Sequence, residues 1–307
     1  MTVGNQALPL LPIGSVERDT GLSKDTLRIW ERRYGFPTPL RDAHGERAYP
    51  PEQVKKLRVI KGLMDRGMRP GKIMSLELAE LLSLSEPSSG GELPVANENV
   101  EAVLALVRAH QVDKLRHELS QIMMRQGAHR FLIDTVSPLN WAIGEAWIRG
   151  ELEVFEEHLY TEVIQGLLRA ALSSMPRGGD TPRVLLTTLP NEPHILGLLM
   201  AEIMLAIDGA RCVSLGTETP MRDIVRAAAS QNADIVALSF SGAYPSSQVV
   251  DALSELRTRL PATIELWAGG TNPALARCKL PGLSVVSGLD EVSLTLGAWR
   301  AAHPIMY

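Results

Sequence analysis

The residues that could bind a metal or a large ligand gather in one loop of the second half of the chain. Arg183 to Thr188 is a short apolar run that predicts a buried strand, and the loop after it carries Glu192, His194 and Gly197 before a predicted helix. Ligands of open α/β sheets bind where the carboxyl ends of strands meet helices. Because an imidazole can coordinate a metal ion, His194 is a candidate metal ligand at that edge.

The sheet that would position this loop is predicted from an alternation of apolar strands and helices. The expected strands cover residues 184–188, 211–216, 234–239, 263–268 and 283–287, and the expected helices cover 196–208, 221–232, 247–260, a short stretch after Pro273, and 291–301. This order is typical of a doubly wound parallel sheet of the flavodoxin-like (Rossmann-type) class. No glycine-rich dinucleotide motif and no phosphate-binding loop is present in the sequence, which argues against those cofactors.

Small and hydroxyl residues follow two more of the predicted strands, where a ligand must approach the backbone closely. They form Ser239-Phe-Ser-Gly242 and Gly269-Gly-Thr-Asn272. Together with Glu192-Pro-His194-Ile-Leu-Gly197, they resemble the cobalamin-binding domain of methionine synthase and related proteins, over residues 181 to about 300. Glu192 stands where that family has Asp, and Ser241 stands where it commonly has Leu or Thr.

The resemblance implies a role for each of these residues. His194 would replace the cofactor's own dimethylbenzimidazole as the lower cobalt ligand, and Glu192 would accept the other imidazole N–H and hold its tautomer. The displaced tail of the cofactor would enter a slot between strands that only small residues can line. The expected cofactor-binding residues of this domain are Glu192, His194, Gly197, Ser239, Ser241, Gly242, Gly269, Gly270 and Thr271.

The beginning of the chain predicts a helix, a tight turn and a second helix. The first helix starts at Ile13 and stops at Gly21, and Ser23 is a natural N-cap for a helix over Lys24–Tyr34. The second helix carries several cations that could reach phosphates or guanine edges. Its expected apolar anchors are Leu27, Ile29 and Trp30.

A small hairpin is expected over Arg41–Tyr49, with its turn at His44-Gly45 and with Arg47 and Tyr49 on one face of the return strand. Such a wing can hold the phosphate backbone beside the groove that the helix occupies. Two amphipathic helices are expected to follow, over about 51–66 and 70–83.

This first segment resembles the DNA-binding domain of MerR-type transcription factors, over residues 13–68. The resemblance rests on Leu27-Arg-Ile-Trp-Glu-Arg-Arg-Tyr-Gly35 and on the Arg41…Gly45-Glu-Arg-Ala-Tyr49 wing. It implies a winged helix-turn-helix that binds a near-palindromic operator in double-stranded DNA as a dimer. The expected DNA-binding residues are Lys24, Thr26, Arg28, Arg32, Tyr34, Arg47 and Tyr49.

A Ser-, Gly- and Pro-rich segment over residues 83–96 is interpreted as a flexible tether. A helical pattern follows over 97–178 and predicts a four-helix bundle, with breaks near His110-Gln111, Gly127, Ser137-Pro138 and Gly150. Within it, nine residues separate Trp147 from Glu157-His158. From composition alone, the tryptophan is interpreted as core, Glu157 as solvated, and His158 as a surface or interhelical histidine.

The whole chain is therefore expected to be a multidomain α and α/β protein. Its expected domains are a DNA-binding domain (1–82), a linker (83–96), a helical cap (97–178) and a cobalamin-binding domain (179–307). This combination resembles the CarH and LitR light-dependent repressors, in which Trp-x9-Glu-His lies over the upper cobalt face and packs against the adenosyl group. The resemblance maps that role onto Trp147, Glu157 and His158.

The same resemblance implies a non-enzymatic light-responsive regulator, expected to be a repressor. It would use adenosylcobalamin, bind operator DNA as a homo-oligomer, either dimer or tetramer, in the dark, and leave the DNA after light breaks the Co–C bond. In characterised members, a histidine directly after the tryptophan can become the upper ligand in the light, but Ile148 stands here. The lit form is therefore expected to be aquo-ligated or to use His158 or His129.

Two other functions compete with this one. A cobalamin-dependent enzyme needs a separate substrate domain, such as a barrel of roughly 250 residues, and the remaining residues here form a DNA-binding domain instead. The alternative that stays open is a MerR-type regulator that responds to cobalamin or to another ligand without photochemistry. Sensing of the mercury type is disfavoured because Cys212 and Cys278 are the only cysteines.

Charge and hydropathy agree with a soluble DNA-binding protein. Residues 1–82 hold 14 Lys and Arg against 10 Asp and Glu, a net +4, whereas residues 83–307 hold 17 against 25, a net −8. This asymmetry favours a polyanion partner at one end of the chain. No apolar run approaches the roughly 18 residues that a membrane span needs, and the first residues lack the basic end of a secretory signal, so a cytoplasmic protein without a membrane partner is expected.

Overall fold

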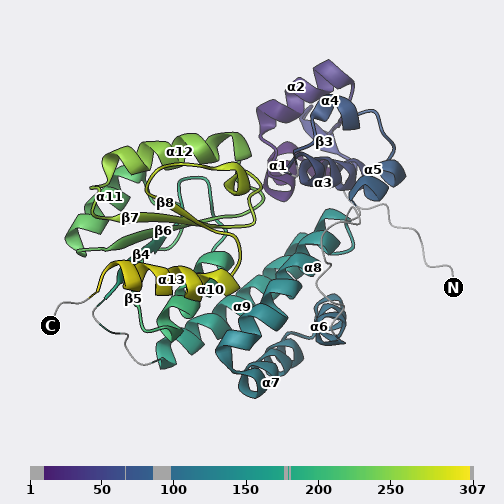
Figure 1. Cartoon of the computed structure of the whole chain (residues 1–307). Helices are drawn as coiled ribbons and strands as arrows, with labels where there is room; N and C mark the ends of the chain where they lie inside the picture. Colours follow the sequence, from purple (N-terminus) through teal and green to yellow (C-terminus); the bar gives the residue numbers. More distant parts are fainter. Residues whose placement is uncertain (1–9, 66, 86–97, 176–178, 180, 305–307) are drawn as a thin grey trace. The chain divides into compact units, whose positions relative to one another are not determined.

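A computed structural model describes residues 10–65, 67–85, 98–175, 179 and 181–304. The chain divides into two compact units. The first combines residues 1–97 with 141–157, and the second combines residues 98–140 with 158–307. Figure 1 follows the chain through both units.

The first unit is built from short helices around a small sheet. Its elements up to residue 85 are β1 (Leu11–Pro12), α1 (Ile13–Thr20), α2 (Lys24–Tyr34), β2 (Leu40–Arg41), β3 (Arg47–Tyr49), α3 (Pro51–Asp65), α4 (Pro70–Ile73) and α5 (Leu78–Ser85). The strands pair antiparallel in the order β1-β3-β2. The strand β1 was not predicted, because two residues carry no period that a sequence pattern can show.

Local signals set the bounds of α1 and α2 as predicted. Gly21 ends α1 with φ 67°, and Gly35 ends α2 with φ 69°, a backbone region that glycine adopts at little cost. The Ser23 hydroxyl accepts a hydrogen bond from the Thr26 backbone N–H at 3.1 Å, which caps α2. The helix-turn-helix expected from the sequence is confirmed.

The second amphipathic helix expected after the wing is divided into α4 and α5. The Glu80 carboxylate accepts a hydrogen bond from the Glu77 backbone N–H at 2.8 Å. This contact caps the N-terminus of α5, which begins at the next residue, Leu78. The linker expected over 83–96 begins inside α5, and residues 86–96 lie outside the described residues. The domain boundaries expected from the sequence stay predictions.

The helical region contains α6 (Glu98–Arg108), α7 (Val112–Arg130), the π-helix η1 (Phe131–Val136), α8 (Ser137–Ile148) and α9 (Val154–Ser174). The expected breaks at His110, Gly127 and Gly150 coincide with positive φ angles of 55°, 74° and 65°. The expected break at Ser137-Pro138 is wrong, because the chain stays helical through it. The Ser137 N–H donates to the Leu132 carbonyl, and a proline in the first turn of α8 needs no N–H partner.

The remaining part of the second unit is a five-stranded parallel sheet with helices on both faces. Its strands are β4 (Arg183–Thr187), β5 (Arg211–Ser214), β6 (Ile235–Phe240), β7 (Glu265–Gly270) and β8 (Leu283–Val286), in the order β5-β4-β6-β7-β8. In Figure 1, α11 (Met221–Ser230) and α12 (Ser246–Arg259) cover one face, and α10 (Leu196–Ile207) and α13 (Asp290–Ala302) cover the other. The flavodoxin-like order expected from the sequence is confirmed.

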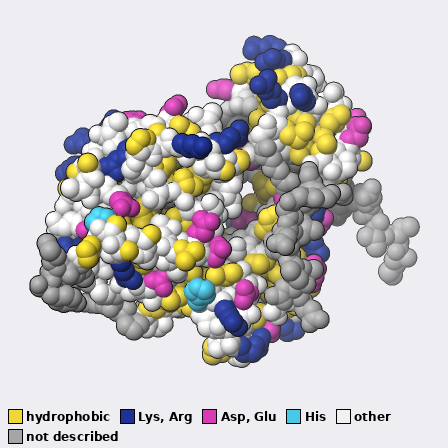
Figure 2. Space-filling view, viewed as in Figure 1, with side chains coloured by type: hydrophobic (Ala, Val, Ile, Leu, Met, Phe, Trp, Pro, Cys, Tyr) yellow, Lys and Arg dark blue, Asp and Glu magenta, His cyan; other side chains and the backbone are white. Residues whose placement is uncertain are grey.

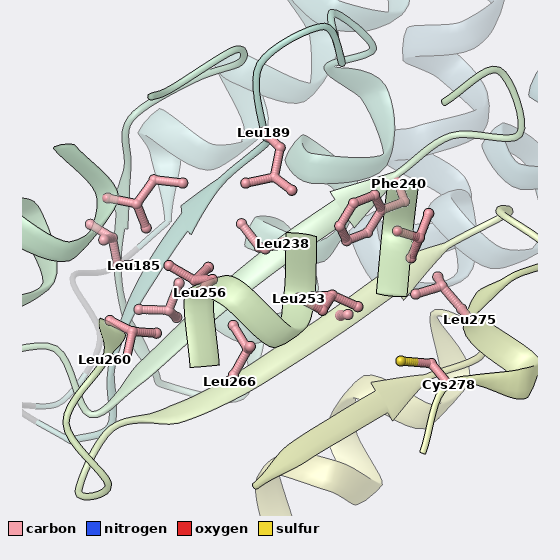
Figure 3. Packing of buried hydrophobic residues seen from close by; sticks show 14 of the residues in the cluster. Leu185, Leu189, Leu238, Phe240, Leu253, Leu256, Leu260, Leu266, Leu275 and Cys278 are labelled. Carbon is pink, nitrogen blue, oxygen red and sulfur yellow. The ribbon is translucent and has the colours of Figure 1, made fainter. Parts of the chain in front are cut away.

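The core between the sheet and the α11–α12 layer is apolar and fully buried. Figure 3 shows Leu238 and Phe240 of β6 facing Leu253 and Leu256 of α12. Burial of such side chains contributes roughly 1.5–3 kcal/mol each, so this layer fixes the strand ends that carry the polar loops. Among the described residues, no helix is long and apolar enough to cross a membrane.

Candidate functional site

The loop between β4 and α10 holds a histidine on a buried carboxylate. His194 is 56% exposed at its side chain, whereas Glu192 is 1% exposed. The Nδ1 atom of His194 lies 2.6 Å from Oε1 of Glu192. This contact fixes Nδ1 as the nitrogen that faces the carboxylate, so Nε2 is the nitrogen available for a ligand.

Ser241, which follows β6, completes this arrangement from the neighbouring strand. Its backbone N–H donates to Oε2 of Glu192 at 2.7 Å, and its hydroxyl lies 2.9 Å from the same oxygen. The hydroxyl also lies 3.0 Å from Nδ1 of His194. Glu192, His194 and Ser241 therefore form one hydrogen-bonded cluster, called the histidine cluster below.

The environment keeps Glu192 ionised. Burial by itself raises the pKa of this carboxyl, but the hydrogen bond and positive charge of His194 and the donors of Ser241 outweigh burial, so the net pKa is lowered. An ionised Glu192 can accept the Nδ1 proton of His194, and in the neutral imidazole this arrangement leaves the lone pair on Nε2. Nearby, burial and the charge of Glu192 raise the pKa of Tyr244, which keeps that phenol neutral.

Three glycines beside the cluster leave no room for a side chain. A Cβ atom at Gly197 would lie 2.9 Å from the Ser239 hydroxyl, and one at Gly270 would lie 2.1 Å from the Phe240 carbonyl oxygen. Gly270 also has φ 118°, and Gly269 would meet the Val286 carbonyl at 3.1 Å. The register pairs Ser239 with Gly269, so these small residues meet at the carboxyl ends of β6 and β7.

The loops after β6 and β7 are tied together by polar side chains. Asn272 is 3% exposed, and its amide donates to the carbonyls of Ser241 and Tyr244 at 3.0 and 2.8 Å. The Gly242 N–H donates to the Thr271 hydroxyl at 2.9 Å. Asn272 was not singled out from the sequence, although a polar residue directly after Gly-Gly-Thr was a signal for it. It holds the backbone that positions Ser241.

The residues expected above the cobalt fall in different places. Trp147 and Glu157 belong to the first unit, whereas His158 and the histidine cluster belong to the second. Trp147 and Glu157 are half-buried, and His158 is exposed. The prediction that these three residues share one site with His194 stays a prediction.

The expected DNA-binding helix α2 presents cations to solvent. Lys24, Arg28 and Arg32 are exposed, and Thr26 and Tyr34 are half-buried. Basic side chains gather over α2 in the upper part of Figure 2. In the free protein, Arg28 contacts Asp25 at 3.0 Å on the same helix. An exposed ion pair of this kind contributes less than about 1 kcal/mol, so it does not prevent Arg28 from meeting a phosphate.

For this domain, the DNA contact expected of Tyr49 stays a prediction, and the expectation that Ile29 is an apolar anchor is wrong. Tyr49 is fully buried in the apolar core, so its ring has no surface to offer DNA in this conformation. Ile29, expected to be an anchor, is 46% exposed, because the helix turns it away from the face that buries Leu27 and Trp30. Arg47 is half-buried and bonds Glu31 of α2 at 2.8 Å, which ties the wing to the helix.

Comparison with known protein families agrees with the helix-turn-helix at the start of the chain and with the doubly wound sheet at its end. Residues 11–79 match the MerR HTH family regulatory proteins, and residues 182–294 match the B12 binding domain. The winged helix-turn-helix, the doubly wound sheet with its histidine cluster and these matches define a transcription regulator that binds DNA and is associated with cobalamin.

Two relatives match most of the chain and are transcriptional repressors. HTH-type transcriptional repressor CarH of Myxococcus xanthus is 31% identical over 255 residues, which cover 81% of this chain and 85% of that protein. HTH-type transcriptional repressor CarA of the same organism is 31% identical over 287 residues, which cover 92% of this chain and 94% of that protein. The chain belongs to this family of repressors.

Among solved structures, the monomethylamine corrinoid protein of Methanosarcina barkeri resembles this chain in fold. The TM-score is 0.53 at 14% identity, over 66% of this chain and 98% of that chain. At this identity, the likeness concerns the fold alone.

Proposed function

We propose that this regulator is a light-responsive repressor that uses adenosylcobalamin. In the dark it binds operator DNA as a homo-oligomer, a dimer or a tetramer, and after illumination it leaves the operator. The observation that supports this most directly is the histidine cluster beside Gly197 and Gly270. It leaves Nε2 of His194 as the ring nitrogen that does not face Glu192, beside glycines that pack closely against neighbouring atoms.

The chain's own residues would hold the cofactor from below. His194 would supply Nε2 to the cobalt, Glu192 would fix the imidazole tautomer, and Ser241 donates the hydrogen bonds that hold Glu192. The residues that line the slot for the tail are Gly197, Ser239, Gly242, Gly269, Gly270 and Thr271. The glycines and Ser239 fit this role because a larger side chain at Gly197 or Gly270 would collide with its neighbours.

When bound, adenosylcobalamin supplies a cobalt–carbon bond that visible light breaks. Trp147, Glu157 and His158 are proposed to pack against the adenosyl group and to exclude water from it. Ile148 cannot serve as an upper ligand, because an aliphatic side chain has no donor atom. The lit form therefore relies on His158, His129 or solvent. A bis-histidine spectrum that persists after both histidines are replaced by alanine would disprove this assignment.

The decisive experiment records absorption spectra of the purified protein with adenosylcobalamin in the dark and after green light. Operator binding is measured in parallel. Retained cofactor together with a loss of operator binding in the light is expected. If the purified protein does not retain the cofactor, the proposed sensor is refuted. His194→Ala serves as the control, because it should abolish the absorption spectrum of cobalamin ligated by a protein histidine.

A second candidate is a cobalamin- or ligand-responsive repressor without photochemistry. Ile148 favours it, because the histidine used by the familiar photocycle is missing at that position. The same experiment separates the two functions. Operator binding that changes with added cobalamin but is equal in dark and light would support the second candidate.

A further inference from the structure

One contact surface inside the first unit has a role in neither DNA binding nor cobalamin binding as described above. The helix α3 of the DNA-binding domain packs against residues 147–153, which include the end of α8 and the turn before α9. Residues 147–153 are called the latch segment below. The contact consists of an ion pair to the exposed carboxylate of Glu153, a cation–π contact and two close approaches at glycines.

Arg58 of α3 lies at the centre of this surface. It is 7% exposed, and it forms a two-point ion pair with Asp19 of α1, with N–O distances of 2.6 and 2.8 Å. The guanidinium also lies 5.7 Å from the centre of the Trp147 ring and 3.8 Å from the Glu153 carboxylate. A guanidinium over an indole is attractive, and it is more so when both groups are shielded from water. Arg58 thus joins two helices of the DNA-binding domain to the latch segment.

At two glycines, a side chain from the other side of the contact approaches the backbone closely. A Cβ atom at Gly62 would lie 3.0 Å from both Cδ1 and Cγ2 of Ile148. A Cβ atom at Gly150 would lie 2.7 Å from the Lys55 side chain, and Gly150 has φ 65°. Both approaches depend on the missing side chain, so the surface is matched in shape and not only in charge.

The docked latch segment leaves the DNA-binding face open. Arg28 of α2 has a side-chain exposure of 51% in the same structure, and Arg32 is also exposed. The contact uses α3 and α1 instead. The latch contact itself therefore does not cover the cations of α2.

We propose that the latch segment holds the DNA-binding domain in its operator-binding arrangement and releases it when the upper cobalt ligand changes. The role of the signal rests on the proposed function, because Trp147 is the residue expected beside the upper ligand. Ile148, which replaces a histidine at the position after the tryptophan, anchors the domain at Gly62. Release removes this contact, which lowers the effective concentration of the DNA-binding domain at the second half-site of an operator.

A reversible disulfide tests the latch directly. In the variant Gly62→Cys/Ile148→Cys, mild oxidation of the full chain without cofactor is expected to form the bond within the monomer, and failure to form it would overturn the contact. With adenosylcobalamin bound, the oxidised variant should keep its operator Kd within about twofold after illumination. The reduced variant and the unmodified protein should weaken at least about tenfold. An oxidised variant that responds to light like the unmodified protein refutes the holding role.

A size exchange provides a second test. Gly62→Ala should weaken operator binding in the dark by about tenfold, and the added Ile148→Ala should restore most of it. Gly297→Ala is the matched control, because a methyl group at that helical glycine meets no described atom within 4 Å. Equal Kd values for Gly62→Ala and the control would overturn the latch. If operator binding by the unmodified protein changes with neither cobalamin nor light, the proposed function and the signalling role of the latch segment are refuted. Disulfide formation in the double-cysteine variant would still show whether the contact between α3 and the latch segment exists.

Discussion

Replacing Glu192 by glutamine tests whether the histidine cluster fixes the cobalt ligand. The substitution keeps the size of the side chain and removes its charge. In the native protein, one carboxylate oxygen faces Nδ1 of His194 and the other faces the backbone N–H of Ser241, at 2.6 and 2.7 Å. Glutamine has only one oxygen to offer to these two positions.

Both orientations of the new amide are unfavourable. If its oxygen faces His194, its NH2 group meets the Ser241 N–H, and two donors oppose each other at a site that is 1% exposed in the native protein. If its oxygen faces Ser241, its NH2 group donates to His194 Nδ1, and the imidazole must carry its proton on Nε2. The second orientation removes the lone pair that would bind cobalt.

The magnitude follows from the cost of a buried unsatisfied donor, about 1–3 kcal/mol. At 1.4 kcal/mol for each factor of ten, cobalamin affinity should fall by roughly 5- to 150-fold. The assay is a titration of cobalamin absorbance with Glu192→Gln, beside urea unfolding of the same protein. Glu255→Gln is the matched control, because Glu255 is half exposed and its carboxylate pairs with Arg259 on the same helix.

Unchanged cobalamin affinity and unchanged stability in Glu192→Gln would refute the reasoning. The pH dependence gives a second check on the same group. Because the folded state lowers the pKa of Glu192 from its ordinary value of 4.5, the stability it contributes is fully present above that value. It is lost as the pH falls through the lowered pKa. Glu192→Gln should lack this part of the acid transition.

Three further substitutions test other parts of the structure. Gly270→Ala should lower the free energy of unfolding in urea by more than about 2 kcal/mol, because Gly270 has φ 118° and the added methyl group would lie 2.1 Å from the Phe240 carbonyl oxygen. An unchanged free energy of unfolding would contradict this close approach. Tyr49→Phe should leave operator affinity unchanged, and the free energy of unfolding should stay equal or rise by up to about 1 kcal/mol, because the buried hydroxyl has no hydrogen-bond partner among the described residues. Weaker operator binding would instead indicate that the Tyr49 hydroxyl contacts DNA directly. Arg32→Ala should weaken operator binding and reduce its salt slope by about 1, and an unchanged slope would place Arg32 away from phosphates.

Elements with local signals were predictable from the sequence. The glycines at 21 and 35 and the Ser23 cap fix α1 and α2 through contacts within a few residues, so no tertiary information is needed. The strand order was predictable as well, because apolar strands that alternate with helices have few ways to form a parallel sheet. The proximity of Glu192 to His194 follows from a separation of two residues in one loop.

Side-chain burial in the DNA-binding domain could not be predicted in the same way. Arg47 and Tyr49 lie two residues apart, on one face of a strand, but only the packing of β3 against the helices buries the tyrosine and turns the arginine to Glu31. Ile29 and Leu27 lie two residues apart on α2, and the direction of the core decides that one is exposed and the other is buried.

The sequence by itself determined the two kinds of domain, the cobalt-ligand candidate His194 and its carboxylate partner, because those features depend on short-range spacing. Only the tertiary structure decided that Ser241 holds Glu192 and that Asn272 ties the loop of Ser241 to the loop after β7, because these residues meet across strands. It also placed Ile148 against Gly62, 86 residues earlier in the chain. Contacts between residues so far apart arise from packing, and no local pattern records them.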